Sequence, residues 1–187
     1  MTMRLRSATP LATPETPIAA GATIGGWRVA RVLTACDDRC TMVETEPRDG
    51  RRAILRVFRD PDDETRQRVH VLSRVRAGID APLLPVLDAG EDRGLAYVAH
   101  PLVRGCTLAE LVAEGPLDPS AAMTIVGQIA GALETATLLG LPHESVTPDS
   151  VLITSAKPHQ ALLTDYGFAM PRGAACARAS AIAAADY

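Results

Sequence analysis

Three oxygen-bearing side chains near the end of the chain could do chemistry: Ser145, Ser150 and Asp165. Asp165 precedes Tyr166-Gly167, and its carboxylate could hold a divalent cation. Ser150 comes just before the apolar run 151–153 and offers a hydroxyl, which is the weaker ligand for such a cation. Ser145 is a poor proton acceptor, because a neutral hydroxyl does not do the work of a carboxylate. The segment therefore offers one good cation ligand and no general base.

A basic side chain on a predicted strand is the next candidate. Residues 52–58 alternate, with Ile54, Arg56 and Phe58 on one face and three apolar residues on the other. Asp49-Gly50 is a strong hairpin signal and predicts that this strand pairs with the run 41–45. Arg56 is thus expected to project from a sheet face, beside Ile54.

The remaining elements are predicted from capping residues and periodicity. A strand is expected from Trp27, and two more over 83–88 and 95–99, joined by the loop 90–94. Helices are expected from Asp60-Pro61 to Gly78, from the Thr107-x-x-Glu110 capping box, and from Asp118-Pro119 to Gly140. A strand-rich half followed by a helical half predicts an α+β domain in two lobes.

Composition narrows the function classes. A chain of 187 residues with 47% hydrophobic residues can bury a core, and its formal net charge of −3 gives no reason to expect nucleic acid or an anionic membrane as a partner. No apolar run is expected to span a membrane, and no signal peptide is visible. The four cysteines are interpreted as reduced thiols of a cytoplasmic protein. Cys36 and Cys40 offer only half a zinc site, since no second pair follows at a matching spacing.

The order and spacing of the motifs resemble the bacterial Ser/Thr protein kinase family over residues 25–187. The segment His143-Glu144-Ser145 to Ile153 has the frame of that family's catalytic loop, and Asp165-Tyr166-Gly167 has the frame of its metal-binding turn. Further matching segments are Gly94–Ala99, Val103–Leu108, Gly140–His143 and Ala185–Tyr187. The resemblance implies a protein-kinase-like two-lobed fold, with an antiparallel N-lobe sheet plus one helix and a partial helical C-lobe.

The resemblance also assigns a role to each polar position. Ser145 stands where the family has its catalytic aspartate, Ser150 where it has the magnesium-binding asparagine, and Glu144 where it has an arginine. Arg56 stands at the phosphate-binding lysine, and only Asp165 keeps the family's residue. By the resemblance, ATP and Mg²⁺ are the cofactors, and these changes weaken or remove their binding.

The implied nucleotide site is altered as well. Ile54 replaces a small alanine above the adenine, Leu152 lies below it, and His100 is the gatekeeper before a hinge whose donor is Val103. Residues 34–39 replace the glycine-rich loop with larger side chains, including two aspartates that would repel a nucleotide. A filled slot is expected, in which Ile54 serves as a core residue.

The helix glutamate that should orient the lysine falls near Arg68, which would lose the ion pair. Register leaves two alternatives open: Glu64 pairs with Arg56 instead, or Arg68 is a solvated helix residue. The packed column that links the lobes is expected to be intact, with His143 buried and hydrogen-bonded to backbone. Its members are Leu72, Val86, His143 and Tyr166.

The chain is accordingly divided into a disordered leader (1–21), an N-lobe (22–103) and a partial C-lobe (104–187). Three functions remain open: a pseudokinase that binds a protein partner, an atypical active kinase that uses Arg56 and Asp165, and a truncated remnant. The third follows from the end of the sequence before the family's Ala-Pro-Glu motif, which would leave apolar surface of the 118–139 helix exposed. No membrane or nucleic-acid partner is expected within this chain.

Overall fold

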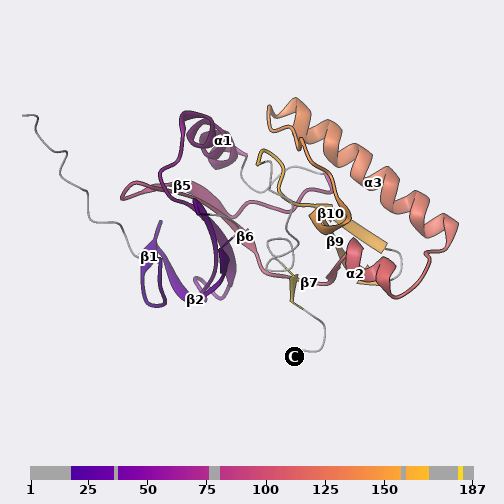
Figure 1. Ribbon diagram of the computed structural model, residues 1–187, viewed down its shortest axis with the longest axis horizontal. Coiled ribbons are helices and arrows are strands. Elements are labelled where there is room, and N and C mark those ends of the chain that lie inside the picture. The colour runs from indigo at the N-terminus through magenta and orange to yellow at the C-terminus, as the bar shows by residue number, and fades with distance from the viewer. Residues whose placement is uncertain (1–17, 36–37, 76–80, 157–158, 169–180, 183–187) are drawn as a thin grey trace, which may run out of the picture.

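The computed structural model describes residues 18–35, 38–75, 81–156, 159–168 and 181–182. Its largest element is a six-stranded antiparallel sheet in the order β1-β2-β3-β4-β6-β5. The strands are β1 (Thr23–Ile24), β2 (Trp27–Ala35), β3 (Cys40–Thr45), β4 (Ala53–Phe58), β5 (Asp88–Asp92) and β6 (Leu95–Pro101). Figure 1 shows α1 lying over one side of this sheet and the remaining helices beyond β6.

The two faces of β4 separate as the alternation predicted. Ala53, Leu55 and Val57 are fully buried in a core on one face, together with residues of β1, β2 and β6. Ile54 packs with Met42 on the other face. The β3–β4 hairpin turns at Asp49-Gly50, where both residues have positive φ (52° and 74°), as a tight hairpin turn requires. Turn chemistry and period therefore fix the register of this hairpin.

The described chain begins at Ile18, within the segment interpreted as a disordered leader. Ile18 is buried in the core that holds Leu55 of β4, and the Gly21 N–H donates to the Val29 carbonyl (2.8 Å). Residues 1–17 lie outside the described residues. The apolar character of Ile18 gives this short stretch a reason to pack against the sheet.

Helix α1 (Asp63–Arg74) starts later than its sequence indicated. Its N-cap is Asp62, whose carboxylate accepts from the Thr65 N–H (2.9 Å), so Pro61 precedes the cap instead of opening the first turn. This hydrogen bond lowers the pKa of Asp62 below its usual value. Val69 and Leu72 are the buried residues of the helix and join the central core. Its predicted continuation to Gly78 lies outside the described residues.

The strand expected over 83–88 is wrong. Only Leu83 makes an isolated bridge, to Leu163, and the regular strand β5 starts at Asp88. Pro82 and Pro85 lack the N–H groups that a continuous ladder needs. The turn after β5 is correspondingly shorter than the predicted loop 90–94, because the strand runs to Asp92.

The second half carries the loops of the site. Its helices are α2 (Leu108–Ala113) and α3 (Pro119–Leu138), and its strands are β7 (Val103–Arg104), β8 (Cys106–Thr107), β9 (Val151–Ala156), β10 (His159–Leu163) and β11 (Ala181–Ile182). The capping box at Thr107 and the cap at Asp118 are both present, as predicted. The short helix η1 (Pro148–Ser150) leads into β9, which pairs with β8 and β10. Strand β11 pairs with β7 in parallel.

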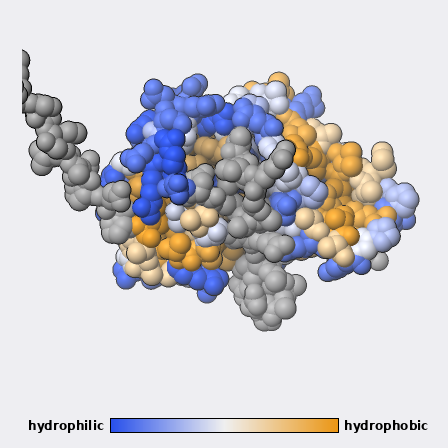
Figure 2. Space-filling model, in the orientation of Figure 1, coloured by the Kyte–Doolittle hydropathy of each residue, from blue (hydrophilic) through white to orange (hydrophobic). Residues whose placement is uncertain are grey.

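Helix α3 buries one stripe and exposes the rest. Ile125, Ile129, Ala132 and Ala136 enter the core, whereas Met123, Val126 and Leu138 are 71%, 61% and 82% exposed. Apolar surface gathers along this helix in Figure 2, in contrast to the hydrophilic surface over α1. The exposed apolar face expected of the 118–139 helix is therefore present.

The length and composition of α3 correct one expectation. Within its 20 residues, an 18-residue window has a mean hydropathy of 1.2, so the helix is long and apolar enough to cross a membrane, whereas no such run was expected. The core helices of soluble proteins can have the same length and apolar content. The buried stripe of α3 instead packs in the same core as Leu72 of α1.

Candidate functional site: a kinase-like cleft with an internal ion pair

The cation-binding carboxylate and the strand arginine meet. The Arg56 guanidinium forms an ion pair with Asp165, and both side chains are nearly buried, at 5% and 9% exposed. β4 supplies Arg56, and the turn after β10 supplies Asp165, whose φ of 60° is unusual for a residue other than glycine. The carboxylate to which the family resemblance assigns a metal ion is thus paired with a cation of the protein itself.

Two aromatic rings enclose this ion pair on one side. Phe58 of β4 stacks on Phe168 with ring centroids 4.8 Å apart and an interplanar angle of 29°. The Arg56 guanidinium carbon lies 5.8 Å from the centroid of Phe168. These contacts bind the start of the segment after Asp165 to the sheet.

The two serines are placed differently. Ser150 is buried, and its hydroxyl donates to the Thr147 carbonyl (2.8 Å) and accepts from the Thr147 N–H (3.0 Å). Ser145 is exposed on the loop between Leu141 and η1. The Ser150 hydroxyl therefore closes the turn from Thr147 to Ser150 through hydrogen bonds to the Thr147 backbone. In the part of the chain that the structure describes, no cluster of three or more His, Cys, Asp or Glu residues could hold a metal ion.

The apolar side chains at the slot implied for the adenine are buried. Ile54 and Met42 are each 1% exposed and Leu152 is 0% exposed, with Leu33 and Leu102 packed against the first two. The burial of Ile54 agrees with its interpretation as a core residue.

The hinge region carries its own contacts. His100 is half-buried, and its Nδ1 lies 2.8 Å from the Pro85 carbonyl. Burial lowers the pKa of His100 to about 4, so its ring is neutral at neutral pH. Val103, the expected hinge donor, lies in β7 and pairs with Ala181 of β11.

Arg68 makes contacts to three segments. It bonds Glu64 on its own helix (2.6 Å), Glu144 of the catalytic-loop segment (3.2 Å) and the Gly167 carbonyl (2.5 Å). Its side chain is only 15% exposed, so the interpretation as a solvated residue is wrong. Glu64 pairs with Arg68, and among the described residues Arg56 pairs with Asp165, so the expected pairing of Glu64 with Arg56 is wrong as well.

The packed column is buried as predicted. Leu72, Val86, His143 and Tyr166 are each less than 5% exposed, and the Tyr166 hydroxyl donates to the Leu84 carbonyl (2.6 Å). Burial raises the pKa of Tyr166 well above its usual value. The backbone hydrogen bond expected for His143 is not found among the described residues, where both ring nitrogens are buried without a partner.

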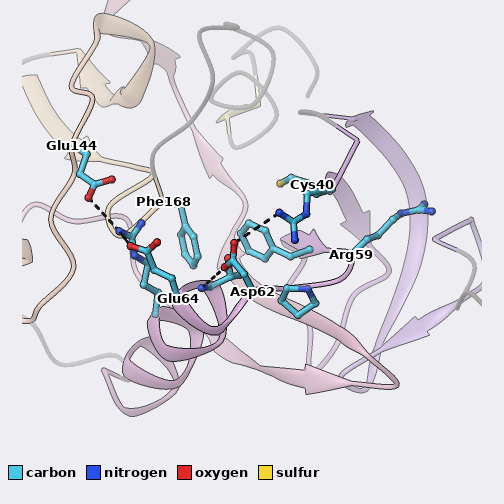
Figure 3. Close-up of a pocket in the computed structure, with 11 residues that line it drawn as sticks. Cys40, Arg59, Asp62, Glu64, Glu144 and Phe168 are labelled. Carbon is cyan, nitrogen blue, oxygen red and sulfur yellow. Dashed lines mark hydrogen bonds and ion pairs between the residues drawn. The ribbon is translucent and has the colours of Figure 1, made fainter. Parts of the chain in front are cut away.

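A pocket of about 290 Å³ opens beside α1. Figure 3 shows Phe168 near its centre and Glu144 and Glu64 approaching one another from two different segments. Its floor includes Phe58 and Phe168, and its rim carries three arginines and three acids (Arg39, Arg59, Arg68, Asp62, Glu64, Glu144). The charges on this rim balance, so the pocket has no clear preference for an anion or a cation. A second hollow of about 400 Å³ lies on the far side of the sheet, around Trp27 and Arg48.

The sequence analysis named Arg56 and Asp165 separately and did not predict that they pair. One signal for this pairing was in the sequence. The resemblance assigns Arg56 to the phosphates and Asp165 to the metal ion of one nucleotide site, so the two opposite charges are expected close together. The Ser150–Thr147 closure had a local signal as well, since hydroxyl residues flank Pro148-Asp149 and can cap such a turn.

The sequence and the fold were compared with those of known proteins. No family model matches the sequence. The chain is 36% identical over 112 residues to the Ser/Thr protein kinase PknE of Mycobacterium bovis, covering 59% of this chain and 19% of that protein. It is 38% identical over 88 residues to PknD of Mycobacterium tuberculosis, covering 46% of this chain and 13% of that protein. The matching region thus spans less than a fifth of the length of either curated relative.

The fold agrees with these relatives. The crystal structure of the Mycobacterium tuberculosis PknI kinase domain matches with a TM-score of 0.66 and 30% identity, over 82% of this chain and 64% of that domain. The structure has a protein-kinase fold, as predicted, with an antiparallel N-lobe sheet and part of the helical lobe. The homologues of this chain are bacterial Ser/Thr protein kinases, which confirms the family resemblance.

Proposed function

We propose that this chain is a pseudokinase: a kinase-shaped binding or regulatory module without phosphotransfer activity. The observation that carries the proposal is the nearly buried ion pair between Arg56 and Asp165. A kinase needs this carboxylate for Mg²⁺ and this strand cation for the phosphates. When the two neutralise each other, both ligands must compete with a contact that is already formed.

Three further features support the same conclusion. Ser145 cannot accept the proton of a substrate hydroxyl, a loss that costs on the order of 10²–10⁴ in rate. The Ser150 hydroxyl is engaged by Thr147 and is a weaker metal ligand than an amide. Ile54 and Met42 are buried together on the sheet face where the resemblance puts the adenine, which argues for a narrowed slot. Together these argue for weak or absent binding of ATP and Mg²⁺.

The partner of such a module is expected to be a protein. Its formal net charge of −3 gives no basis for nucleic-acid binding. The exposed face of α3 and the pocket beside α1 are two surfaces on which a protein could dock.

A thermal-shift titration with ATP and Mg²⁺ tests the proposal directly. Ligand at about 100 times its Kd would stabilise the fold by about 2.7 kcal/mol, an effect that is easily measured. We expect no saturable shift. Asp165→Asn is the matched control, because a shift that persists in that variant arises away from this site. A saturable shift that Asp165→Asn removes, together with phosphate transfer to a protein substrate, would refute the proposal.

An atypical active kinase is the second candidate, favoured by Asp165 itself and by the similarity of the chain to proteins named as Ser/Thr protein kinases. Arg56 retains the positive charge of the lysine, although its planar head differs in shape. This candidate requires Arg56 to leave Asp165 when nucleotide binds. A radiolabelled phosphate-transfer assay distinguishes the two, since turnover abolished by Asp165→Ala would favour the active enzyme.

A truncated remnant is the third candidate, supported by the exposed apolar face of α3. A remnant has no reason to hold a stable monomeric fold. A cooperative urea transition in a monodisperse sample would count against it, and aggregation of the purified chain would count for it.

A further inference from the structure

Arg68 holds together parts of the chain that are far apart in sequence. Its guanidinium donates to Glu144, 76 residues later, and to the Gly167 carbonyl, 99 residues later. The same group donates to Glu64, which fixes its orientation on α1. One side chain thus joins the helix, the catalytic-loop segment and the turn that carries Asp165.

The two anchor segments have constrained backbones. Glu144 has a φ of 49° and Asp165, two residues before Gly167, has a φ of 60°. Such conformations are strained for a residue other than glycine, and persist where surrounding contacts hold them. The ion pair from Arg68 to Glu144 is a contact of that kind, because it fixes the side chain of the residue in the unusual conformation.

The signs of the charges are inverted relative to the pattern that the family resemblance implies. That pattern has an acid near 68 and a base at 144, whereas this chain has Arg68 and Glu144. Changing only one of these would have placed two like charges within reach of each other. Because both are changed, Arg68 and Glu144 still attract each other. Arg56 pairs separately, with Asp165.

We propose that Arg68 and Glu144 form a charge-inverted clamp that holds α1 docked against the catalytic-loop segment. Arg68 is a positioning residue in this scheme. The resemblance implies that α1 is held through a contact with the basic residue of β4. Here that residue, Arg56, pairs with Asp165, and the clamp holds α1 in its place. It does not depend on whether the chain transfers phosphate, since neither Arg68 nor Glu144 has to contact a nucleotide.

A double-mutant cycle on the full chain tests the clamp, with Arg68→Gln, Glu144→Gln and the double variant. The readout is backbone hydrogen exchange, followed by mass spectrometry, in peptides covering 63–74 and 141–150. Each single variant should speed exchange in both peptides by roughly threefold or more, and the double variant should add little beyond either one. Circular dichroism at the same temperature selects conditions in which every variant is folded.

The matched control is a second ion pair of the same helix. Arg66 pairs with Glu91 of β5, and both side chains are close to half-exposed. Arg66→Gln should leave exchange in 141–150 unchanged, because its partner lies in the sheet. A catalytic-loop peptide that responds equally to Arg66→Gln and Arg68→Gln would overturn the clamp. Additive effects of Arg68→Gln and Glu144→Gln would overturn it too. If Arg68→Gln cannot be kept folded, Glu144→Asn carries the test alone, since asparagine tolerates positive φ and α1 should still lose protection.

Discussion

The packed column agrees with the kinase resemblance, whereas the polar positions around Arg56 and Asp165 depart from it. Leu72, Val86 and Tyr166 remain buried where the kinase resemblance places them, whereas Ser145, Ser150 and Arg56 differ from the groups that phosphate transfer requires. Apolar contacts stabilise the folded state of any chain with this fold. A polar group can change identity without loss of the fold when the new group finds a partner, as Arg56 does in Asp165 and Ser150 does in Thr147.

The ion pair in the cleft offers the largest predicted effect on stability. Asp165→Ala removes the carboxylate that faces a nearly buried guanidinium, and should lower the free energy of unfolding by about 3–5 kcal/mol. Urea denaturation at neutral pH measures the loss. Replacing both partners together, as Arg56→Met with Asp165→Leu, should cost much less. A similar loss in the single and double variants would mean that the ion pair itself contributes nothing and that the sites respond to packing alone.

A substitution in the packed column sharpens the comparison from the other side. Leu72→Ala should destabilise the protein by about 2–5 kcal/mol, because Leu72 is 1% exposed and a cavity would remain. Val126→Ala on the exposed face of α3 is the control, and should change stability by less than about 0.5 kcal/mol. Chemical denaturation midpoints give both values. An equal response at the two positions would show that α3 is covered in solution.

The third prediction concerns the pH dependence of stability, which follows from His100 of β6. Its pKa is about 4 in the folded state and about 6.5 when unfolded, so only the unfolded chain gains this proton between those values. Stability should therefore decrease as the pH falls from about 6.5 towards 4, by up to about 1.4 kcal/mol per pH unit.

His100→Gln should flatten that decrease, and the exposed His70→Gln should not. Arg56, which lowers the pKa of His100, and Asp165, which raises it, must be kept intact in this comparison. Denaturation at about pH 7 and about pH 5 decides the matter, and identical slopes for wild type and His100→Gln would exclude this residue as the source.

The smallest effect is expected at Ser150. Ser150→Ala removes two hydrogen bonds that close the turn at Thr147, and should cost about 1 kcal/mol. Ser150→Asn would supply the family's metal ligand while disturbing the same turn. If Ser150→Asn gives Mg²⁺-dependent stabilisation, the cleft retains more metal-binding capacity than we propose.

The sequence was sufficient where the determinants are local. Asp49-Gly50, the Thr107 capping box and the alternation of residues 53–58 each predict their structure through neighbouring backbone and a fixed period. The strand expected over 83–88 shows the limit, because apolar residues suggested a ladder that Pro82 and Pro85 interrupt.

Partner choice could not be derived in the same way. Arg56 and Asp165 are 109 residues apart, and the sequence analysis offered Glu64 as the possible partner of Arg56. Only the folded chain shows that Glu64 reaches Arg68, one turn away on its own helix. Long-range pairing of charges depends on the tertiary arrangement, which a motif frame does not specify.

The stacked rings of Phe58 and Phe168 have a consequence for how the cleft can open. One ring belongs to β4, which pairs with a strand on each side, so an outward movement of the turn after Asp165 would separate the two rings. Such a movement is therefore expected to cost free energy in proportion to the apolar ring area that it exposes.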